Sequence, residues 1–371
     1  MTTTNKAYNR LVIVGNGFDL ALGLNTTYSE FILHYLKAEA KKYIQDPNTT
    51  NKLFTFENSS HYRVRPDYFN SKKTIKDLHS DLVSFLKMDI KNYFFEKILT
   101  EYSNSRWVDI EQAYYDELKR AFLDTPEGYH SMVKATNECM DILAKGLQLF
   151  IIEQQNNRPP DYIERFYTLA EQICESLPEN RRKNIKDHAG NNPPESILYL
   201  NFNYTNTVKK FVELFRGENE ILEVRIIPIH GSVDSPTNPI IFGYGDDTGD
   251  EYKTFENQNN PDLLRMIKSF KYPKTSNYHN LLGYLEKDRF EVSILGHSCG
   301  LSDRTLLKSV FEHKNCVAIQ SYYYKDWEEF FFKTIEISRH FSDKPLMRER
   351  LLSFDETAKI PQVIPTWHTL H

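Results

Sequence analysis

The first chemically suggestive feature is a glycine turn near the N-terminus. The motif Gly15-Asn16-Gly17 directly follows a four-residue apolar strand, Leu11–Val14, and a helix is expected from about Phe18. Glycines let a ligand approach the backbone closely, and the N–H groups at the start of a helix favour an anion. We therefore expect Gly15, Asn16 and Gly17 to bind the phosphates of a nucleotide. A turn that only connects strand to helix is the alternative.

The same loop departs from the dinucleotide-binding fingerprint of dehydrogenases. The third glycine of the G-x-G-x-x-G pattern is replaced by Leu20, and the acidic residue about twenty positions on, Glu39, falls in a helical pattern. A standard dehydrogenase is therefore disfavoured. Asp19 places a carboxylate in a loop that would approach a pyrophosphate, so it must cap the helix or face a ribose hydroxyl.

Two later apolar strands end in side chains suited to positioning and proton transfer. Asn203 lies in an Asn- and Thr-rich turn after Ile197–Phe202, where helix capping is the alternative role. His230 ends the apolar run Val224–Ile229, and a histidine can act as a general base because its pKa lies near working pH. We expect Asn203 and His230 to be catalytic, with a purely structural histidine as the alternative.

A fourth loop reads Gly296-His297-Ser298-Cys299-Gly300, which is the G-x-S-x-G pattern of a serine-hydrolase nucleophile elbow. It follows an expected strand and precedes an expected helix, as the elbow does. Spacing does not select an acid and a base, for which there are two candidate pairs: Asp326 with His340, and Asp355 with His368. A serine hydrolase using Ser298 is therefore one possible function.

Short apolar strands and helical patterns alternate in the second half of the chain. The expected strands after the first are Ile197–Phe202, Val224–Ile229, Ile240–Phe242, Phe290–Leu295 and Cys316–Tyr323. The helical patterns among them are Val208–Phe215, Leu263–Phe270 and Arg304–His313. This alternation predicts an α/β fold with a parallel sheet covered on both faces, whose ligands bind at the carboxyl ends of the strands.

The region between the first strand and the others is helical. Apolar residues recur at three- and four-residue steps from Tyr28 to about Ser176, and the stretch Pro178–Ser196 cannot easily sustain a helix. We therefore expect a large helical insertion after the first strand. The expected parts are 1–27 (first strand and glycine loop), 28–190 (helical insertion), 191–340 (remainder of the α/β domain) and 341–371 (C-terminal tail).

Composition limits the classes of function. The 371 residues carry a formal net charge of −5 and no long basic stripe, which argues against affinity driven by nucleic-acid phosphates. No apolar run approaches the roughly 18 residues that a bilayer requires, and the N-terminus lacks a signal-peptide core, so we expect a cytoplasmic protein with no membrane partner. None of the four cysteines forms a C-x-x-C pair, and we expect no metal.

Several of these segments occur together, and in the same order, in a known family. They are Leu11–Leu20, Phe202–Thr205, Ile229–Gly231, Ile241–Gly243 and Gly296–Asp303. They resemble the motifs of the AbiH-type abortive-infection family of bacterial phage-defence proteins, and Trp107–Glu111 resembles a helical segment of that family. The resemblance covers nearly the full chain. It implies a role in abortive infection and a phage-derived trigger.

The loops also resemble, more distantly, those of the sirtuin fold. The sirtuin glycine loop is matched in spacing by Gly15, Gly17 and Gly23. Asp19 stands in the place of a serine, and Thr205 in the place of an aspartate two residues after the asparagine that Asn203 matches. His230 resembles the catalytic histidine of an H-G pair, and Gly296-His297-Ser298 resembles a ribose-binding turn, which is a second explanation of the G-x-S-x-G run.

The sirtuin resemblance implies a Rossmann-type sheet that binds NAD. Sirtuin deacetylases carry a four-cysteine zinc module that this chain has no cysteine pairs to build, whereas sirtuin-like defence proteins commonly hydrolyse NAD. It therefore implies an NAD glycohydrolase in which NAD is the substrate, His230 the base, and Asn203 the group that orients ribose or water. A nucleotide-binding sensor that acts through a partner is the alternative from another class of protein.

The helical insertion is larger than a connection between a strand and a helix needs, and it carries several amphipathic faces. We expect these faces to cover the α/β domain, to roof the pocket, or to form the contacts of a homo-oligomer. Glu111 is expected to line the pocket if its helix faces inward.

Overall fold

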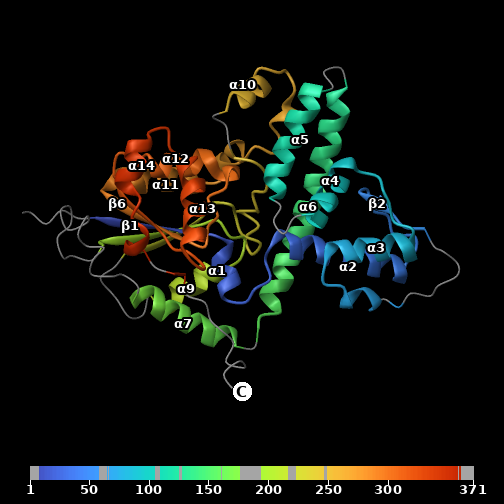
Figure 1. The fold of residues 1–371 in the computed structure, drawn as a ribbon, viewed down its shortest axis with the longest axis horizontal. Coiled ribbons are helices and arrows are strands. Elements are labelled where there is room, and N and C mark those ends of the chain that lie inside the picture. The colour runs from blue at the N-terminus through green and yellow to red at the C-terminus, as the bar shows by residue number, and fades with distance from the viewer. Residues whose placement is uncertain are drawn as a thin grey trace, which may run out of the picture.

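The computed structural model describes residues 8–57, 65, 67–104, 109–124, 128–159, 161–175, 194–215, 223–245, 249–357 and 359–360. Within these residues the chain forms an α/β part and a helical part that lie side by side (Figure 1). The boundary expected between Pro178 and Ser196 falls mostly outside the described residues. In the part of the chain that the structure describes, every helix is too short or too polar to cross a membrane.

A parallel sheet of five strands forms the centre of the α/β part. The strands are β1 (Asn9–Val14), β4 (Ser196–Asn201), β5 (Glu223–Pro228), β6 (Phe290–Leu295) and β7 (Cys316–Ser321), in the spatial order β5-β4-β1-β6-β7. Leu11 of β1 lies beside Leu198 of β4 on one side and Val292 of β6 on the other. The chain thus starts in the middle of the sheet, adds strands on one side and then on the other. The point of reversal at β1 is where doubly wound sheets bind ligands.

Helices cover both faces of this sheet, as the sequence predicts. One face packs against α11 (Asn277–Lys287), α12 (Arg304–Phe311) and the C-terminal helix α14 (Lys344–Arg350), so part of the expected 341–371 tail belongs to this layer. The other face packs against α1 (Asn16–Ala21), α7 (Tyr162–Glu175) and α9 (Thr207–Phe215) (Figure 1). The rings of Phe18, Phe166 and Phe211 meet there at centroid distances of 5.5 and 5.7 Å.

Five of the helices between β1 and β4 form a second core. They are α2 (Tyr28–Gln45), α3 (Ile75–Leu86), α4 (Tyr93–Asn104), α5 (Ile110–Asp124) and α6 (Tyr129–Asn156). We refer to these five helices as the helical region. Two short antiparallel strands, β2 (Phe54–Thr55) and β3 (Asp89–Ile90), pair beside them. The helical periodicity expected for this part of the sequence is confirmed, because apolar residues at three- and four-residue steps, such as Phe31, Leu36 and Leu82, are buried in helices.

The segment between β5 and α11 corrects two sequence expectations. Ile240–Phe242 is not a strand, and Leu263–Phe270 is not one helix but contains the short 3-10 turns η3 (Pro261–Leu263) and η4 (Lys268–Phe270). Both runs are apolar because Phe242, Leu263 and their neighbours pack into the core of the helical region. The remaining α-helices within the described residues are α10 (Asp250–Glu256) and α13 (Trp327–Ser338).

Candidate functional site

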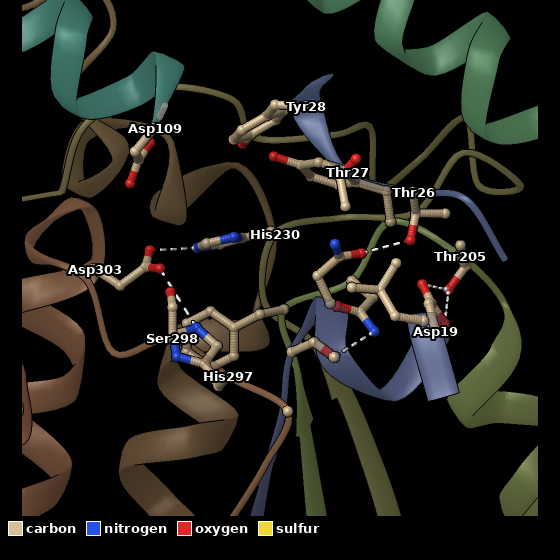
Figure 2. Close-up of a pocket in the computed structure, with 18 of the residues that line it drawn as sticks. Asp19, Thr26, Thr27, Tyr28, Asp109, Thr205, His230, His297, Ser298 and Asp303 are labelled. Carbon is tan, nitrogen blue, oxygen red and sulfur yellow. Dashed lines mark hydrogen bonds and ion pairs between the residues drawn. The ribbon is translucent and has the colours of Figure 1, made fainter. Parts of the chain in front are cut away.

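A pocket of about 590 Å³ lies at the carboxyl ends of the central strands. The loops after β1, β4 and β6 line its floor, and Thr27, Tyr28 and Glu111 line it from the helical region. Figure 2 shows Asp303, His230, His297 and Ser298 on one side of this pocket and Asp19 and Thr205 on the other. All of the site residues predicted from the sequence line this pocket, Asn203 included.

The glycine loop after β1 packs directly on the loop after β6. The N–H of Gly15 donates to the carbonyl of Leu295 at 3.0 Å, and the N–H of Gly17 donates to Gly296 at 2.8 Å. A Cβ on Gly15 would lie 2.4 Å from the Cα of His297, and one on Gly17 would lie 2.8 Å from the Cα of Gly296. The contact between these loops therefore requires both glycines. It also occupies the backbone N–H groups of Gly15 and Gly17, which are expected from the sequence to bind phosphate.

Two amide side chains hold the glycine loop in place. Asn203 donates its Nδ2 to the carbonyl of Gly15 at 3.0 Å, and its own N–H donates to Asn201 at 3.1 Å. Asn16 accepts a hydrogen bond of 2.6 Å from the hydroxyl of Thr26. Asn203 therefore ties the loop after β4 to the loop after β1, which is a positioning contact that the sequence does not specify.

The side chains of Asp19 and Thr205 form a buried hydrogen-bonded pair. Thr205 donates its hydroxyl to the Asp19 carboxylate, with Oγ1 2.8 Å from Oδ2 and 3.1 Å from Oδ1. Burial raises the pKa of Asp19 to about 6, against the lowering effect of Thr205, Thr207, Arg158 and Asn203. The side chains of Asp19 and Thr205 are thus in direct contact, and the charge of Asp19 is satisfied within the protein.

His230 is buried at the pocket wall beside a carboxylate. Its Nε2 lies 3.1 Å from Oδ1 of Asp303, without the alignment of a full hydrogen bond. Its ring meets that of Phe202 edge-on at 4.9 Å. Burial, and next the charge of Lys268, lower the pKa of His230 to about 4, so the imidazole is neutral near pH 7. A neutral histidine beside a carboxylate has the arrangement of a general base.

Asp303 is the centre of a buried charge cluster. Its Oδ1 also accepts a hydrogen bond of 2.8 Å from Nζ of Lys268, and its Oδ2 lies 3.5 Å from Nε2 of His297. Although burial opposes ionisation, Lys268 and then His230 hold the pKa of Asp303 well below its usual range. The cluster therefore keeps one carboxylate ionised at the pocket wall.

Two acidic residues at the start of α5 bring the helical region into this cluster. Glu111 accepts from the N–H of Gly243 at 2.9 Å and from Nζ of Lys268 at 3.0 Å. Burial first, and the nearby carboxylates of Asp109 and Asp303 as well, raise the pKa of Glu111 to about 8. Asp109 accepts from the N–H groups of Glu111 and Gln112 and so caps α5. The expectation that Glu111 faces the pocket is confirmed, whereas Trp107 lies outside the described residues.

The G-x-S-x-G loop differs from a nucleophile elbow. Ser298 lines the pocket, but the strained residue with a positive φ of 58° is Cys299 rather than the serine. Asp326 caps its own helix α13, and Nε2 of His340 lies 2.7 Å from the carbonyl oxygen of Cys299. Neither member of that candidate pair is thus placed to serve Ser298, and His368 of the second pair lies outside the described residues.

Sequence reasoning missed two members of the charge cluster and one cation of the pocket. Asp303 ends the last of the family-like segments, Gly296–Asp303, in which the polar residues His297, Ser298 and Ser302 precede it. Lys268 gives no signal, because the sequence predicts a helix over Leu263–Phe270, whereas the residue lies in the short turn η4. Lys333 of α13 lines the pocket and donates to the carbonyl of His297, and among the described residues that line this pocket it is the one lysine or arginine.

Chemically, the site combines a neutral base, an ionised carboxylate and a polar cavity of the size that small-molecule ligands occupy. Within the ranges that the structure describes, no set of three or more His, Cys, Asp or Glu side chains could hold a metal ion. The site can therefore position a polar ligand and accept a proton from it.

The model of the family described as "Bacteriophage abortive infection AbiH" matches residues 11–324. This range contains β4, β5, β6 and β7 of the main sheet, all but the first two residues of β1, and the whole charge cluster. No curated protein matches the chain in sequence. Since the family model spans most of the chain, this protein belongs to the AbiH family, whose description assigns it to abortive infection by bacteriophage.

Proposed function

We propose that this AbiH-family protein hydrolyses NAD to nicotinamide and ADP-ribose when phage infection triggers it. In this reaction the bond between C1′ of the ribose and the nicotinamide nitrogen breaks, and the electron pair leaves with a neutral nicotinamide. A water oxygen bonds to C1′, and the proton of that water passes to a base. Loss of NAD would halt metabolism in the infected cell.

The topology of the sheet supports a nucleotide as the ligand. The pocket lies where the strand order reverses at β1, which is where doubly wound sheets bind nucleotides. The resemblance to sirtuins points to the same loops, because it concerns Gly15–Gly17, His230 and Gly296–Ser298, all of which line this pocket or its floor. Lys333 supplies a positive charge for the diphosphate in place of the two N–H groups that the loops use for each other.

The charge cluster supports cleavage of a glycosidic bond at its end of the pocket. The transition state of this reaction has oxocarbenium character, and the ionised carboxylate of Asp303 favours positive charge nearby. His230 would accept the proton from water, directly or through a ribose hydroxyl. Asn203 would orient the ribose or the water by fixing the Gly15 loop, and Ser298 would contact a ribose hydroxyl. The reaction needs no metal because the leaving group is already cationic.

The observation that carries this proposal is the neutral His230 held against Asp303 at the point of strand reversal. Purified protein, with phage lysate as a source of trigger, is incubated with NAD and free nicotinamide is measured. We expect release by the wild type and a fall of about 10² to 10⁴ in His230→Ala, because a general base contributes about that factor.

The matched control is His279→Ala, which removes an exposed histidine on α11 and should turn over NAD like the wild type. Equal turnover by folded His230→Ala and the wild type would remove His230 from the mechanism. Binding of NAD without any release of nicotinamide would instead favour a nucleotide-binding sensor.

A further inference from the structure

Lys268 is an unusual residue for its place in the fold. It lies in the short turn η4 and its side chain is fully buried. Burying an ammonium group costs several kcal/mol unless it is paired, so a lysine in such a position needs partners. Its Nζ has two, Asp303 at 2.8 Å and Glu111 at 3.0 Å, and both carboxylates line the pocket.

The contacts of Lys268 and His230 converge on a single atom. Nζ of Lys268 and Nε2 of His230 both lie within 3.1 Å of Oδ1 of Asp303, while Oδ2 of the same carboxylate faces His297. A carboxylate held at both oxygens by three neighbours cannot rotate freely. The orientation of Asp303, and hence the edge of His230 that it faces, is therefore fixed by Lys268 from outside the catalytic loops.

We propose that Lys268 is a positioning residue for the general base: by holding Asp303 ionised and oriented, it keeps the imidazole proton of His230 on Nε2 and leaves Nδ1 free to accept a proton. This inference rests on the proposed role of His230. The incomplete alignment between His230 and Asp303 is consistent with it, because catalytic hydrogen bonds often tighten only when substrate binds.

Several charged or titratable groups from different elements surround the pair formed by His230 and Asp303 of η6 (Leu301–Asp303). Lys268 from η4 and His297 from the loop after β6 act on both members of the pair. The ring of Tyr204, from the loop after β4, lies 6.5 Å from that of His230, and Asp109 and Glu111 at the start of α5 interact with Asp303. Among them, Lys268 lowers the pKa of His230 and Asp303 raises it. Removing the charge of Lys268 should therefore raise the pKa of His230 where Asp303 remains ionised, and Oδ1 of Asp303 then loses one of its two contacts.

The test uses the full chain with isotope-labelled histidine and follows His230 by NMR during a pH titration. In the wild type we expect a neutral ring at pH 7 with its proton on Nε2. In Lys268→Met, which keeps an unbranched side chain only one atom shorter, we expect the titration midpoint of His230 to rise by about one pH unit or more and the Nε2–H tautomer to lose its predominance. Assignment of the His230 signal comes from its loss in His230→Ala.

The matched control is Lys271→Met, the same substitution three residues away. Lys271 is half-buried, and its Nζ donates to the carbonyl of Phe242 rather than to Asp303. A shift of His230 in Lys268→Met but not in Lys271→Met supports the positioning role. Equal titrations of His230 in all three proteins would overturn it, and so would an Nδ1–H tautomer in the wild type, which needs no variant to fold.

Activity separates this inference from the proposed function. If NAD is the substrate, Lys268→Met should lower kcat by about 10², as loss of orientation does, change KM by less than about threefold, and move the acidic limb of the pH profile upward. A fall in stability with an unmoved pH profile would show a merely structural lysine. If the wild type releases no nicotinamide but the NMR shifts occur as described, the positioning stands and the assignment of NAD fails.

Discussion

At the scale of single residues, the Asp303 carboxylate contacts three side chains of the site, those of His230, Lys268 and His297. Its replacement therefore tests the charge cluster directly. Asp303→Asn keeps the shape of the side chain but removes the charge that faces His230 and Lys268. We expect nicotinamide release to fall by about 10² to 10⁴, as when the carboxylate that orients a catalytic histidine is replaced by an amide. Asp77→Asn on α3 removes an exposed carboxylate and should leave turnover unchanged. Wild-type turnover in folded Asp303→Asn would exclude an Asp–His pair from the mechanism.

Asp19 predicts a pH dependence of stability. Its pKa is raised from 3.8 to about 6 in the folded protein, so between these values the folded chain keeps a proton that the unfolded chain releases. The resulting stabilisation is present below about pH 4 and is lost as the pH rises through 6; for a shift of this size it amounts to about 3 kcal/mol. Other groups, such as His230, titrate in the same window.

A comparison with Asp19→Asn isolates this contribution, because asparagine does not ionise. Urea unfolding of both proteins from pH 4 to pH 7 should show the wild type losing about 3 kcal/mol relative to the variant as the pH rises. A difference in unfolding free energy that is independent of pH would mean that Asp19 titrates normally in the folded protein.

At the scale of elements, the contact between the two glycine-containing loops decides the shape of the pocket. Gly296 has a φ of 71°, and a Cβ there would lie 2.4 Å from the backbone nitrogen of Phe18. Gly296→Ala should therefore destabilise the protein by about 1–3 kcal/mol and separate the loops. Gly283→Ala in α11 has open space around the new methyl group and should stabilise by about 0.5–1 kcal/mol. Equal effects in urea unfolding would contradict the claimed contact.

The strands of the main sheet could be predicted because buried parallel strands are short, continuous apolar runs. β6 is buried along its whole length, and its expected range Phe290–Leu295 matches the structure. Ile240–Phe242 has the same apolar character, yet it is not a strand, and its side chains divide between two cores: Ile241 packs with the sheet and Phe242 with the helical region. Apolar composition reports burial, but it cannot say whether the partner is a strand or a helix.

Local pattern could predict the candidate site only where its residues follow a strand, whereas Glu111 is expected from the family-like segment Trp107–Glu111. His230 and His297 stand at such ends, so the topology of a parallel sheet brings them together. Lys268 reaches the same point from an irregular segment, and Glu111 reaches it from a helix of the helical region, more than a hundred residues away in the chain. Contacts of this kind depend on tertiary packing, so the local pattern of apolar and polar residues does not predict them.

At the scale of the whole molecule, the helical region and the sheet share the pocket, but the helices also present apolar side chains to solvent. Leu149 of α6 is 66% exposed, and Ile163 and Tyr167 of the adjoining helix α7 lie one turn apart with exposures of 67% and 48%. We propose that such faces form a homo-oligomer.

Light scattering at micromolar concentrations should show an oligomer for the wild type and dissociation for the double variant Ile163→Asp with Tyr167→Asp. Phe332→Asp, on α13, removes a similarly exposed side chain from the other part of the molecule and should leave the oligomer intact. A monomer at every concentration, with and without NAD, would contradict the proposal, and dissociation by Phe332→Asp alone would move the interface to α13.

The central claim is that His230-dependent cleavage of NAD causes abortive infection, and infected cells test it most directly because they contain the trigger. NAD, nicotinamide and ADP-ribose are quantified through one round of phage infection in bacteria that express the wild type, His230→Ala or His279→Ala at equal levels. The account predicts that NAD falls and nicotinamide and ADP-ribose rise only with the wild type and His279→Ala, and that only these two protect the culture. Protection by the wild type with NAD unchanged, or equal protection by His230→Ala, would contradict it.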